Sequence, residues 1–339
     1  MNVGVIGAGA VAAHHVRAIQ QVQGLRLNGI ASRTRAGAEK MARQFKVPAY
    51  NSASDVFNDP EVNLVIICTL PDSHGPLAVE AARKGKHVLV EKPLDVSLER
   101  AQQTVDECNK AGVVLAVVSQ KRFTDGARFL YDSIKQNRLG KILQADAYVK
   151  WYRDDAYYNR PGKGNWEVEG GGALINQTIH QVDLLRWLVG PVSRLHCEWQ
   201  LASAHAIESE DNASVLMRFQ NGAIGVIQAS TSFYPGFPER LEIHGTAGSV
   251  VAEGDYLKSW NVKDSSFPNP PQDLFQKSMV GASKPMDISV EPFRRQLENV
   301  VSSIRCGRQP LVPGEEGLEA LRLVMAMYQS ARDNRQVWL

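Results

Sequence analysis

Short apolar runs alternate with helical spacings over the first 120 residues of the chain. The run at 2–6 is rich in Val and Ile, and similar runs recur between segments whose apolar residues lie three and four positions apart. The predicted strands are 2–6, 27–32, 49–50, 64–68, 87–91 and 113–118, and the predicted helices are one that ends near residue 22, then 36–45, 76–84 and 97–111. Strands that alternate with helices in this way form a parallel, doubly wound sheet. The pattern therefore predicts an α/β domain over residues 1–120.

The pattern changes after Ser119, where strands with period-two alternation dominate. The predicted strands are 141–153, 192–201, 212–219, 223–232 and 240–245, and the predicted helices are 127–136, 292–305 and 314–334. Asn221-Gly222 between two strands is typical of a hairpin, because both residues tolerate the positive φ of a type I′ turn. Residues 121–339 are therefore predicted to form a second, α+β domain with a mostly antiparallel open sheet. Within it, residues 268–285 are predicted as a long loop.

The first predicted strand enters its helix through Gly7-x-Gly9-x-x-Ala12. In the dinucleotide turn of a Rossmann domain, the first glycine allows a tight turn and the second lets the backbone approach a pyrophosphate. The third small residue permits close packing of helix on strand. The N-terminus of the helix then offers N–H groups to the phosphates. The sequence therefore predicts that this domain binds NAD or NADP.

The end of the second strand bears on which dinucleotide binds, since an acidic residue there accepts hydrogen bonds from the ribose hydroxyls of NAD. Here the strand is followed by Ser32-Arg33-Thr34-Arg35, with two cations and no carboxylate. Cations suit the 2′-phosphate of NADP, so the sequence favours NADP. Alternatively, Arg33 stacks on the adenine through its planar guanidinium, and NAD is then as good a ligand.

Polar residues also follow the later strands of this domain. Thr69, Leu70 and His74 come after strand 64–68, and Glu91-Lys92-Pro93 ends strand 87–91. Ligands of open α/β sheets bind at the carboxyl edge, so we expect these residues beside the nicotinamide half of the cofactor. Taken alone, Lys92 also fits a solvated loop lysine. The candidate cofactor ligands are Gly7, Ala8, Gly9, Ala10, Val11, Ser32, Arg33, Thr69, Leu70, His74, Glu91 and Lys92.

Three glycines at 170–172 precede a predicted helix in the second domain. Asn176 and His180 are four residues apart on that helix and share one face, with Asp183 on the same side. A single helical histidine is often structural, but the glycines before it let a ligand come close. Upstream, the stretch 149–166 is rich in aromatic and hydrogen-bonding side chains, which suit a polyhydroxylated ring or an oligomer contact.

Composition narrows the class of protein. With 44% hydrophobic and 22% charged residues, the composition is that of a globular protein. Its net charge of +2 is too small to attract the phosphate backbone of a nucleic acid. No apolar stretch approaches the roughly 18 residues of a membrane helix, and no signal peptide is visible. The four cysteines form no C-x-x-C pair, which fits reduced thiols and predicts no metal site. We therefore expect a cytoplasmic protein with no nucleic-acid or membrane partner.

The chain resembles the Gfo/Idh/MocA family of NAD(P)-dependent oxidoreductases, the glucose-fructose oxidoreductase and inositol dehydrogenase group. The resemblance covers nearly the whole chain, and the order of its motifs is more specific than any one of them. The matching stretches are Gly7-x-Gly9-x-x-Ala12 with His15, Thr69-x-Pro71-x-x-His74, Glu91-Lys92-Pro93, Gly170-Gly171-Gly172 through His180 and Asp183, Ile243-His244-Gly245-Thr246 and Val312-x-Gly314-Glu315-Glu316-Gly317.

The resemblance implies a Rossmann domain followed by an open sheet that binds substrate and often forms a homodimer or homotetramer. It also implies that Lys92 and His180 lie by the nicotinamide, so that Lys92, His180 and Asn176 are the candidate catalytic residues. Many relatives have an aspartate in place of Asn176, which puts a three-member proton relay in doubt. Relatives with similar upstream stretches act on sugars or their derivatives, including nucleotide sugars. The candidate substrate ligands are Lys92, Arg122, Tyr152, Arg153, Trp166, Asn176 and His180.

Three functions follow from these expectations. The first is hydride transfer between nicotinamide and a secondary hydroxyl of a sugar, cyclitol or sugar derivative. The second is redox-assisted cleavage or elimination, in which the cofactor is oxidised and reduced within one turnover. The third is a non-catalytic protein that senses NAD(P), since a binding fold does not dictate an activity. Retention of both Lys92 and His180 favours an enzyme.

Overall fold

The chain separates into two compact units in a computed structural model that describes residues 1–202, 205–275 and 289–339. Unit 1 consists of residues 1–120 and 289–321, and unit 2 of residues 121–288 and 322–339. The predicted division placed 289–321 in the second domain, whereas these residues pack with the N-terminal strands. They do so because Phe293 and Leu297 join the same buried apolar cluster as Val16 of the first helix. The functional roles given to the two domains remain predictions.

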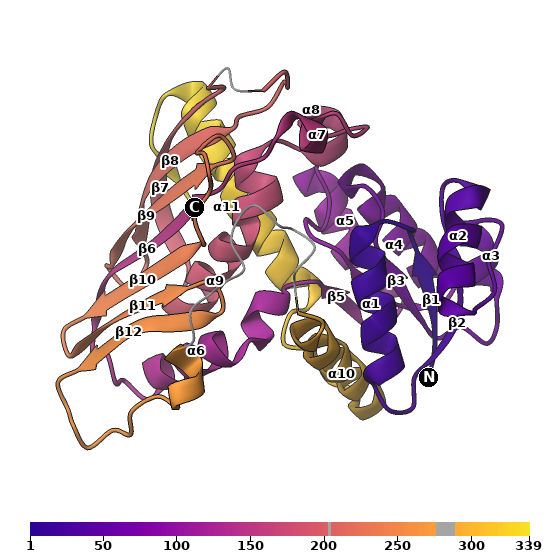
Figure 1. Cartoon of the computed structure of the whole chain (residues 1–339), viewed down its shortest axis with the longest axis horizontal. Coiled ribbons are helices and arrows are strands. Elements are labelled where there is room, and N and C mark those ends of the chain that lie inside the picture. Colours follow the sequence, from indigo (N-terminus) through magenta and orange to yellow (C-terminus); the bar gives the residue numbers. More distant parts are fainter. Residues whose placement is uncertain (203–204, 276–288) are drawn as a thin grey trace. The chain divides into compact units, whose positions relative to one another are not determined.

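Unit 1 is built on a five-stranded sheet in the order β2-β1-β3-β4-β5, with every pair parallel. Buried apolar residues fill its strands, as expected when helices cover both faces (Figure 1). The predicted doubly wound α/β fold is confirmed. The strands are β1 (Asn2–Ile6), β2 (Arg26–Ala31), β3 (Leu64–Ile67), β4 (His87–Val90) and β5 (Leu115–Val117). The helices are α1 (Ala10–Gln21), α2 (Arg35–Phe45), α3 (Ala53–Asn58), η1 (Pro71–Ser73), α4 (His74–Arg83), α5 (Leu98–Lys110) and α10 (Glu291–Cys306).

The ends of these strands are level with one another. Ile6 of β1 pairs with Ile67 of β3, Ile67 pairs with Val90 of β4, and Val90 pairs with Val117 of β5. Because the strands are parallel, the residues that follow them emerge at one edge of the sheet. Register alone therefore brings the glycine turn after β1 and the lysine after β4 to the same edge.

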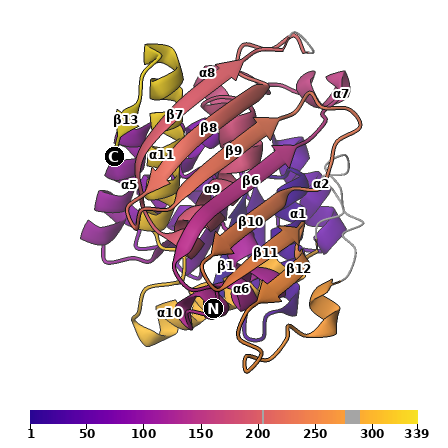
Figure 2. The same ribbon diagram turned by 90° about the vertical axis from the view of Figure 1, so that its left-hand side faces the viewer.

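Unit 2 is built on an eight-stranded sheet in the order β12-β11-β10-β6-β9-β8-β7-β13, which Figure 2 shows with α9 behind it. Only β6 and β9 pair in parallel, so the predicted, mostly antiparallel sheet is confirmed. The strands are β6 (Ile142–Lys150), β7 (Val192–Gln200), β8 (Asn212–Phe219), β9 (Ile224–Ser230), β10 (Arg240–Gly245), β11 (Gly248–Glu253), β12 (Tyr256–Val262) and β13 (Val337–Trp338). The last three were not predicted, since β11 and β12 join through turns of two residues and β13 is only two residues long.

The remaining helices surround or connect this sheet. They are α6 (Asp125–Lys135), α7 (Asp155–Tyr158), α8 (Trp166–Glu169), the π-helical turn η3 (Leu174–Thr178), α9 (Ile179–Val189) and η4 (Gln272–Phe275). Two of the three points where the chain passes between the units lie within η2 (Gln120–Phe123) and α11 (Gly314–Asp333), and the third is at 288/289. Of the predicted loop at 268–285, residues 272–275 form η4, and residues 276–285 lie outside the described residues.

The hairpin between β8 and β9 differs in detail from the predicted type I′ turn. Phe219 N–H donates to the Ala223 carbonyl at 2.9 Å, and Gly222 N–H donates to the Phe219 carbonyl at 3.0 Å. Gly222 has a φ of 92°, whereas Asn221 is not in the positive-φ region. The loop is therefore three residues long and has the pattern of a type I turn closed by a glycine bulge.

Candidate active site

The turn after β1 in unit 1 has room for a dinucleotide phosphate. Gly7 has a φ of 117°, and a Cβ there would lie 2.3 Å from the Cys68 carbonyl oxygen, so the tight turn requires glycine. A Cβ built at Gly9 meets nothing within 4 Å. Gly9 also starts α1 without a side-chain cap, which leaves the first helical N–H groups available to an anion. These features fit the predicted cofactor.

The two cations after β2 differ in their contacts. Arg35 donates to Glu39 at 2.6 Å and to Asn51, so its guanidinium is held by its own helix and a neighbouring loop. Thr34 caps α2 by accepting a hydrogen bond from Gly37 N–H at 3.3 Å. Arg33 is exposed and Ser32 is half-buried. Arg33 is thus the residue of this stretch best placed to reach a phosphate.

Glu91, directly before Lys92, is bonded within the protein. The Nε2 of His15 donates to its Oε1 at 2.9 Å, and the backbone N–H of Lys92 donates to its Oε2 at 3.1 Å. Burial raises the pKa of Glu91, but the hydrogen bond from His15 and the charges of His15 and Lys92 together outweigh burial and lower it. The carboxylate therefore anchors the backbone that carries Lys92, and its predicted contact with the cofactor stays a prediction.

His74 lies between two loops at the same edge of the sheet. Its Nδ1 lies 2.7 Å from the Pro93 carbonyl oxygen and its Nε2 lies 3.2 Å from the Thr69 carbonyl oxygen. Burial lowers the pKa of His74, so the ring is neutral and has one proton, which we assign to Nδ1 for the shorter bond. The Lys92–Pro93 peptide bond is cis. With its proton on Nδ1, His74 holds the turn after Lys92 through the Pro93 carbonyl. Its other ring edge lies against the loop of Thr69 and Leu70, both of which are half-buried.

In unit 2, Asn176 and His180 follow the glycine turn. Gly170 and Gly171 have φ values of 78° and 146°, and the chain then enters η3 and α9. Asn176 lies in the π-helical turn, where its Nδ2 donates to the Gly171 carbonyl at 3.2 Å, and His180 lies in the first turn of α9. The four-residue spacing that predicted a shared face therefore crosses a π-helical turn, a feature frequent at functional sites.

Asp183 and Arg122 form a buried ion pair beneath this helix. The Nε and one terminal nitrogen of Arg122 donate to the two carboxylate oxygens of Asp183 at 2.8 and 2.5 Å. The guanidinium also lies 5.4 Å from the centre of the Trp187 ring. Arg122 is only 1% exposed, so it braces α9 in this structure, and its role as a substrate ligand stays a prediction.

The aromatic stretch lies beside the segment that carries Asn176. Gln177 donates to the Tyr157 hydroxyl at 3.0 Å, and the guanidinium of Arg153 lies 5.4 Å from the centre of the Tyr157 ring. Burial lowers the pKa of Arg153. Tyr152 contacts the exposed Tyr234 ring edge to face at 5.3 Å. Tyr157 thus links Arg153 to Gln177, the residue that follows Asn176 in the chain.

Trp166 approaches the same segment from α8. Its indole N–H donates to the Glu208 carbonyl at 3.1 Å, and its ring meets Tyr328 edge to face at 5.0 Å. Tyr328 in turn donates to Glu210, a residue that the sequence analysis missed. Neither Glu210 nor Tyr328 stands in a recognisable motif, and a buried acid looks like a surface acid in the sequence.

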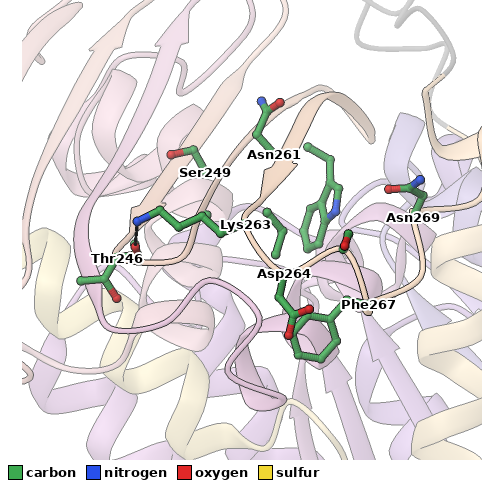
Figure 3. A pocket seen from close by; sticks show the side chains of 12 residues that line it. Thr246, Ser249, Asn261, Lys263, Asp264, Phe267 and Asn269 are labelled. Atoms are coloured by element: carbon green, nitrogen blue, oxygen red, sulfur yellow. Dashed lines mark hydrogen bonds between the residues drawn. The ribbon is translucent and has the colours of Figure 1, made fainter.

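A cavity of about 550 Å³ lies at the ends of β10, β11 and β12 (Figure 3). Lys263 points across its wall and donates to the Thr246 carbonyl at 2.8 Å. None of the predicted site residues lines it. Over 1–202, 205–275 and 289–339, no three His, Cys, Asp or Glu side chains gather to hold a metal ion. Nor does any described helix have the length and apolar character to cross a bilayer.

Two family models and several relatives match this chain. The model "Oxidoreductase family, NAD-binding Rossmann fold" covers residues 1–119, and the "GFO/IDH/MocA C-terminal domain" covers residues 127–251. Myo-inositol 2-dehydrogenase of Thermotoga maritima is 26% identical over 100% of this chain and 98% of its own length. The scyllo-inositol 2-dehydrogenase (NAD(+)) of Bacillus subtilis is 25% identical over 99% and 95%.

A solved structure shares more sequence with the chain. The WlbA dehydrogenase from Bordetella pertussis, in complex with NADH and UDP-GlcNAcA, is 30% identical and superposes with a TM-score of 0.88. The match covers 100% of this chain and 98% of that one. Levoglucosan dehydrogenase with NADH, at 21% identity and a TM-score of 0.86, shares the fold. Together with the glycine turn of unit 1 and the sheet of unit 2, these matches show that the chain belongs to the Gfo/Idh/MocA oxidoreductase family.

Proposed function

We propose that the protein is an NAD(P)-dependent oxidoreductase that transfers a hydride between nicotinamide and a secondary hydroxyl of a sugar, cyclitol or sugar derivative. The observation that carries this proposal is the level register of β1, β3 and β4, which puts the open glycine turn and Lys92 at one edge of the sheet. Ligands of open α/β sheets bind at this edge, so Lys92 lies where a substrate next to the nicotinamide is expected. The names of the relatives support a polyhydroxylated substrate.

Each candidate catalytic residue has a distinct role in the proposal. The bound nicotinamide supplies the hydride chemistry. His180 removes the proton of the hydroxyl, because the pKa of a histidine is ordinarily near neutrality. Lys92 donates a hydrogen bond to the same oxygen and stabilises its developing negative charge. Asn176 orients the substrate. Because its side chain is an amide, it cannot accept the proton from His180, and His180 therefore passes the proton to solvent.

The sugar derivative that we propose to test first is UDP-GlcNAcA. It is bound in the WlbA structure, which the chain matches over its full length at 30% identity. In this chain, the aromatic faces of Tyr152, Tyr157 and Trp166 suit a sugar ring or a base. The Arg153 guanidinium beside them suits an acidic group.

The finer assignments of cofactor and assembly belong to the same proposal. We propose that Arg33 favours NADP, although the WlbA structure contains NADH and NAD therefore has to be tested equally. We also propose a homodimer or homotetramer that forms through the sheet of unit 2, in a protein of the cytoplasm. On that sheet Leu216 and Ile224 are 58% and 40% exposed on neighbouring strands, so a partner would cover apolar surface.

The proposal is tested with a panel of inositols, free sugars, sugar acids and UDP-sugars, each supplied with NAD and with NADP. Nicotinamide absorbance is the readout. We expect net reduction of the cofactor with at least one sugar derivative, and no reduction without substrate. A panel in which the cofactor binds and nothing is turned over would contradict the proposal. Substrate cleavage without net reduction would replace it with redox-assisted elimination.

A further inference from the structure

A buried carboxylate lies beneath the segment that carries Asn176 and His180. Glu210 is 0% exposed and lies just before β8. Its Oε2 accepts a hydrogen bond from Gly172 N–H at 2.8 Å, and its Oε1 accepts one from Leu174 N–H at 2.8 Å. Tyr328 of α11 donates to Oε1 at 2.9 Å. Three donors therefore converge on one acid, and two of them are backbone amides at the start of the η3–α9 segment.

The glycine turn is shaped to this acid and its tyrosine. A Cβ at Gly172 would lie 1.8 Å from the Glu210 carbonyl oxygen, and a Cβ at Gly171 would lie 2.1 Å from the Tyr328 hydroxyl. The backbone of Glu210 contributes as well, since its carbonyl accepts from Ala173 N–H at 2.9 Å. The turn is thus held on both sides, and glycine is required because the partner atoms come so close.

The hydrogen bonds continue from the turn to the candidate catalytic residue. Asn176 donates its side-chain N–H to the Gly171 carbonyl at 3.2 Å, and its backbone N–H bonds to the Gly172 carbonyl at 3.0 Å. A shift of the turn therefore moves Asn176 directly. It also moves the start of α9, where His180 is the second residue of the helix.

We propose that Glu210, supported by Tyr328, is a positioning residue: it fixes the glycine turn and thereby the place of Asn176 and His180. The inference rests on the proposed roles of those two residues. Glu210 touches neither the substrate nor the reacting atoms in this account. Its effect on the reaction comes through the backbone of residues 172–174.

The two oxygens of a carboxylate match the two backbone donors of the turn. Each of its oxygens accepts from a different backbone N–H, and a glutamine would put an NH₂ group against one of those donors. Burial raises the pKa of Glu210 to about 7, although the bonds from Leu174, Tyr328 and Gly172 oppose the rise. The other titratable groups that face it are Tyr328 and Cys197, and burial raises the pKa of both. A glutamine at position 210 therefore keeps the volume of the side chain but loses the hydrogen bond from one of the two backbone N–H groups.

The test compares Glu210→Gln with Asp146→Asn. Asp146 is a matched control because it is a buried acid of unit 2 that accepts a hydrogen bond from a backbone amide outside the glycine turn, Val226 N–H at 2.8 Å. Amide hydrogen exchange is followed in the peptide that covers residues 172–180, in the free protein without cofactor or sugar. We expect exchange there to be about 10-fold to 100-fold faster in Glu210→Gln and unchanged within about twofold in Asp146→Asn.

Kinetics supply the readout that a purely structural role would not change. With the panel sugar that the wild type turns over fastest, we expect Glu210→Gln to lower kcat about 30-fold while KM stays within about threefold, because misplaced catalytic groups slow the chemical step. Tyr328→Phe removes one of three donors, so its kcat should fall about threefold. That milder variant keeps the test valid if Glu210→Gln does not fold.

The outcomes separate this inference from the proposed function. Unchanged exchange at residues 172–180 in Glu210→Gln would overturn the positioning role, and so would equal losses of kcat in Glu210→Gln and Asp146→Asn. A wild type that turns over no sugar would instead remove the proposed function. In that case the exchange experiment would still decide whether Glu210 holds the turn.

Discussion

The sheet edge of unit 1 and the glycine turn of unit 2 place functional groups by different means. In unit 1, the register of parallel strands brings the turn at Gly7 and Gly9 to the same edge as Lys92. In unit 2, Asn176 and His180 depend on side chains that are distant in the sequence, among them Glu210 and Tyr328. Backbone pairing therefore sets most of the first region, with Glu91 and His15 anchoring the backbone of Lys92. The second region depends mainly on a few buried polar contacts.

The largest expected effect comes from removing one proposed catalytic group in each unit. Lys92→Met and His180→Ala should each lower kcat about 10²-fold to 10⁴-fold, because one removes a hydrogen bond to the developing oxyanion and the other removes the general base. Steady-state kinetics with the best panel sugar measures this. Dinucleotide affinity, followed by fluorescence titration, should remain in His180→Ala. A kcat within twofold of wild type in either variant would remove that residue from the mechanism.

Two glycine substitutions compare the regions directly. Gly172→Ala should lower the free energy of unfolding by about 3 kcal/mol, because its Cβ would overlap the Glu210 backbone. Gly9→Ala should leave it within about 0.5 kcal/mol, since its Cβ meets only open space, and should instead weaken dinucleotide binding about 10-fold. Denaturant unfolding and cofactor titration measure the pair. Equal losses of unfolding free energy in Gly172→Ala and Gly9→Ala would contradict the contrast between the two regions.

The acid of unit 2 should give a dependence of stability on pH. The carboxyl of Glu210 titrates near 4.5 in the unfolded chain and near 7 in the folded one, so the folded state binds its proton more tightly. The stabilisation that this proton binding gives to the folded state is fully present below about pH 4.5 and is lost as pH rises through 7. The free energy of unfolding changes by about 3 kcal/mol over this range. The free energies of unfolding of the wild type and of Glu210→Gln are measured at pH 5 and at pH 8. The difference between the two proteins should change between these pH values. A difference between the two proteins that does not vary with pH would contradict the assignment.

The smallest expected effect concerns the cofactor. Arg33→Ala should weaken NADP binding about 10-fold and change NAD binding by less than about twofold, since only NADP has the 2′-phosphate that the guanidinium would bind. Arg35→Ala is the control, because Arg35 is held by Glu39. Equal losses for NADP and NAD in Arg33→Ala would show that Arg33 stacks on the adenine.

The contrast also explains what the sequence could predict. The apolar periods of unit 1 and the motif from Gly7 to Ala12 are local signals, and they were enough to predict the sheet and the edge at which its strands end. The hairpin strands of unit 2 were largely found by their alternation, but β11 and β12 were missed. The roles of Arg122 and Glu210 depend on contacts across 61 and 38 positions, respectively. No local pattern separates a buried partner of this kind from a surface residue.

The central claim is hydride transfer from a carbinol carbon to the cofactor, and isotope transfer tests it most directly. The best panel sugar is prepared with deuterium at the carbon to be oxidised and incubated with the wild type and NAD or NADP. The account predicts that the reduced nicotinamide contains the deuterium, and that His180→Ala transfers it at least about 10²-fold more slowly. Deuterium that appears in water, with none in the reduced cofactor, would contradict the account.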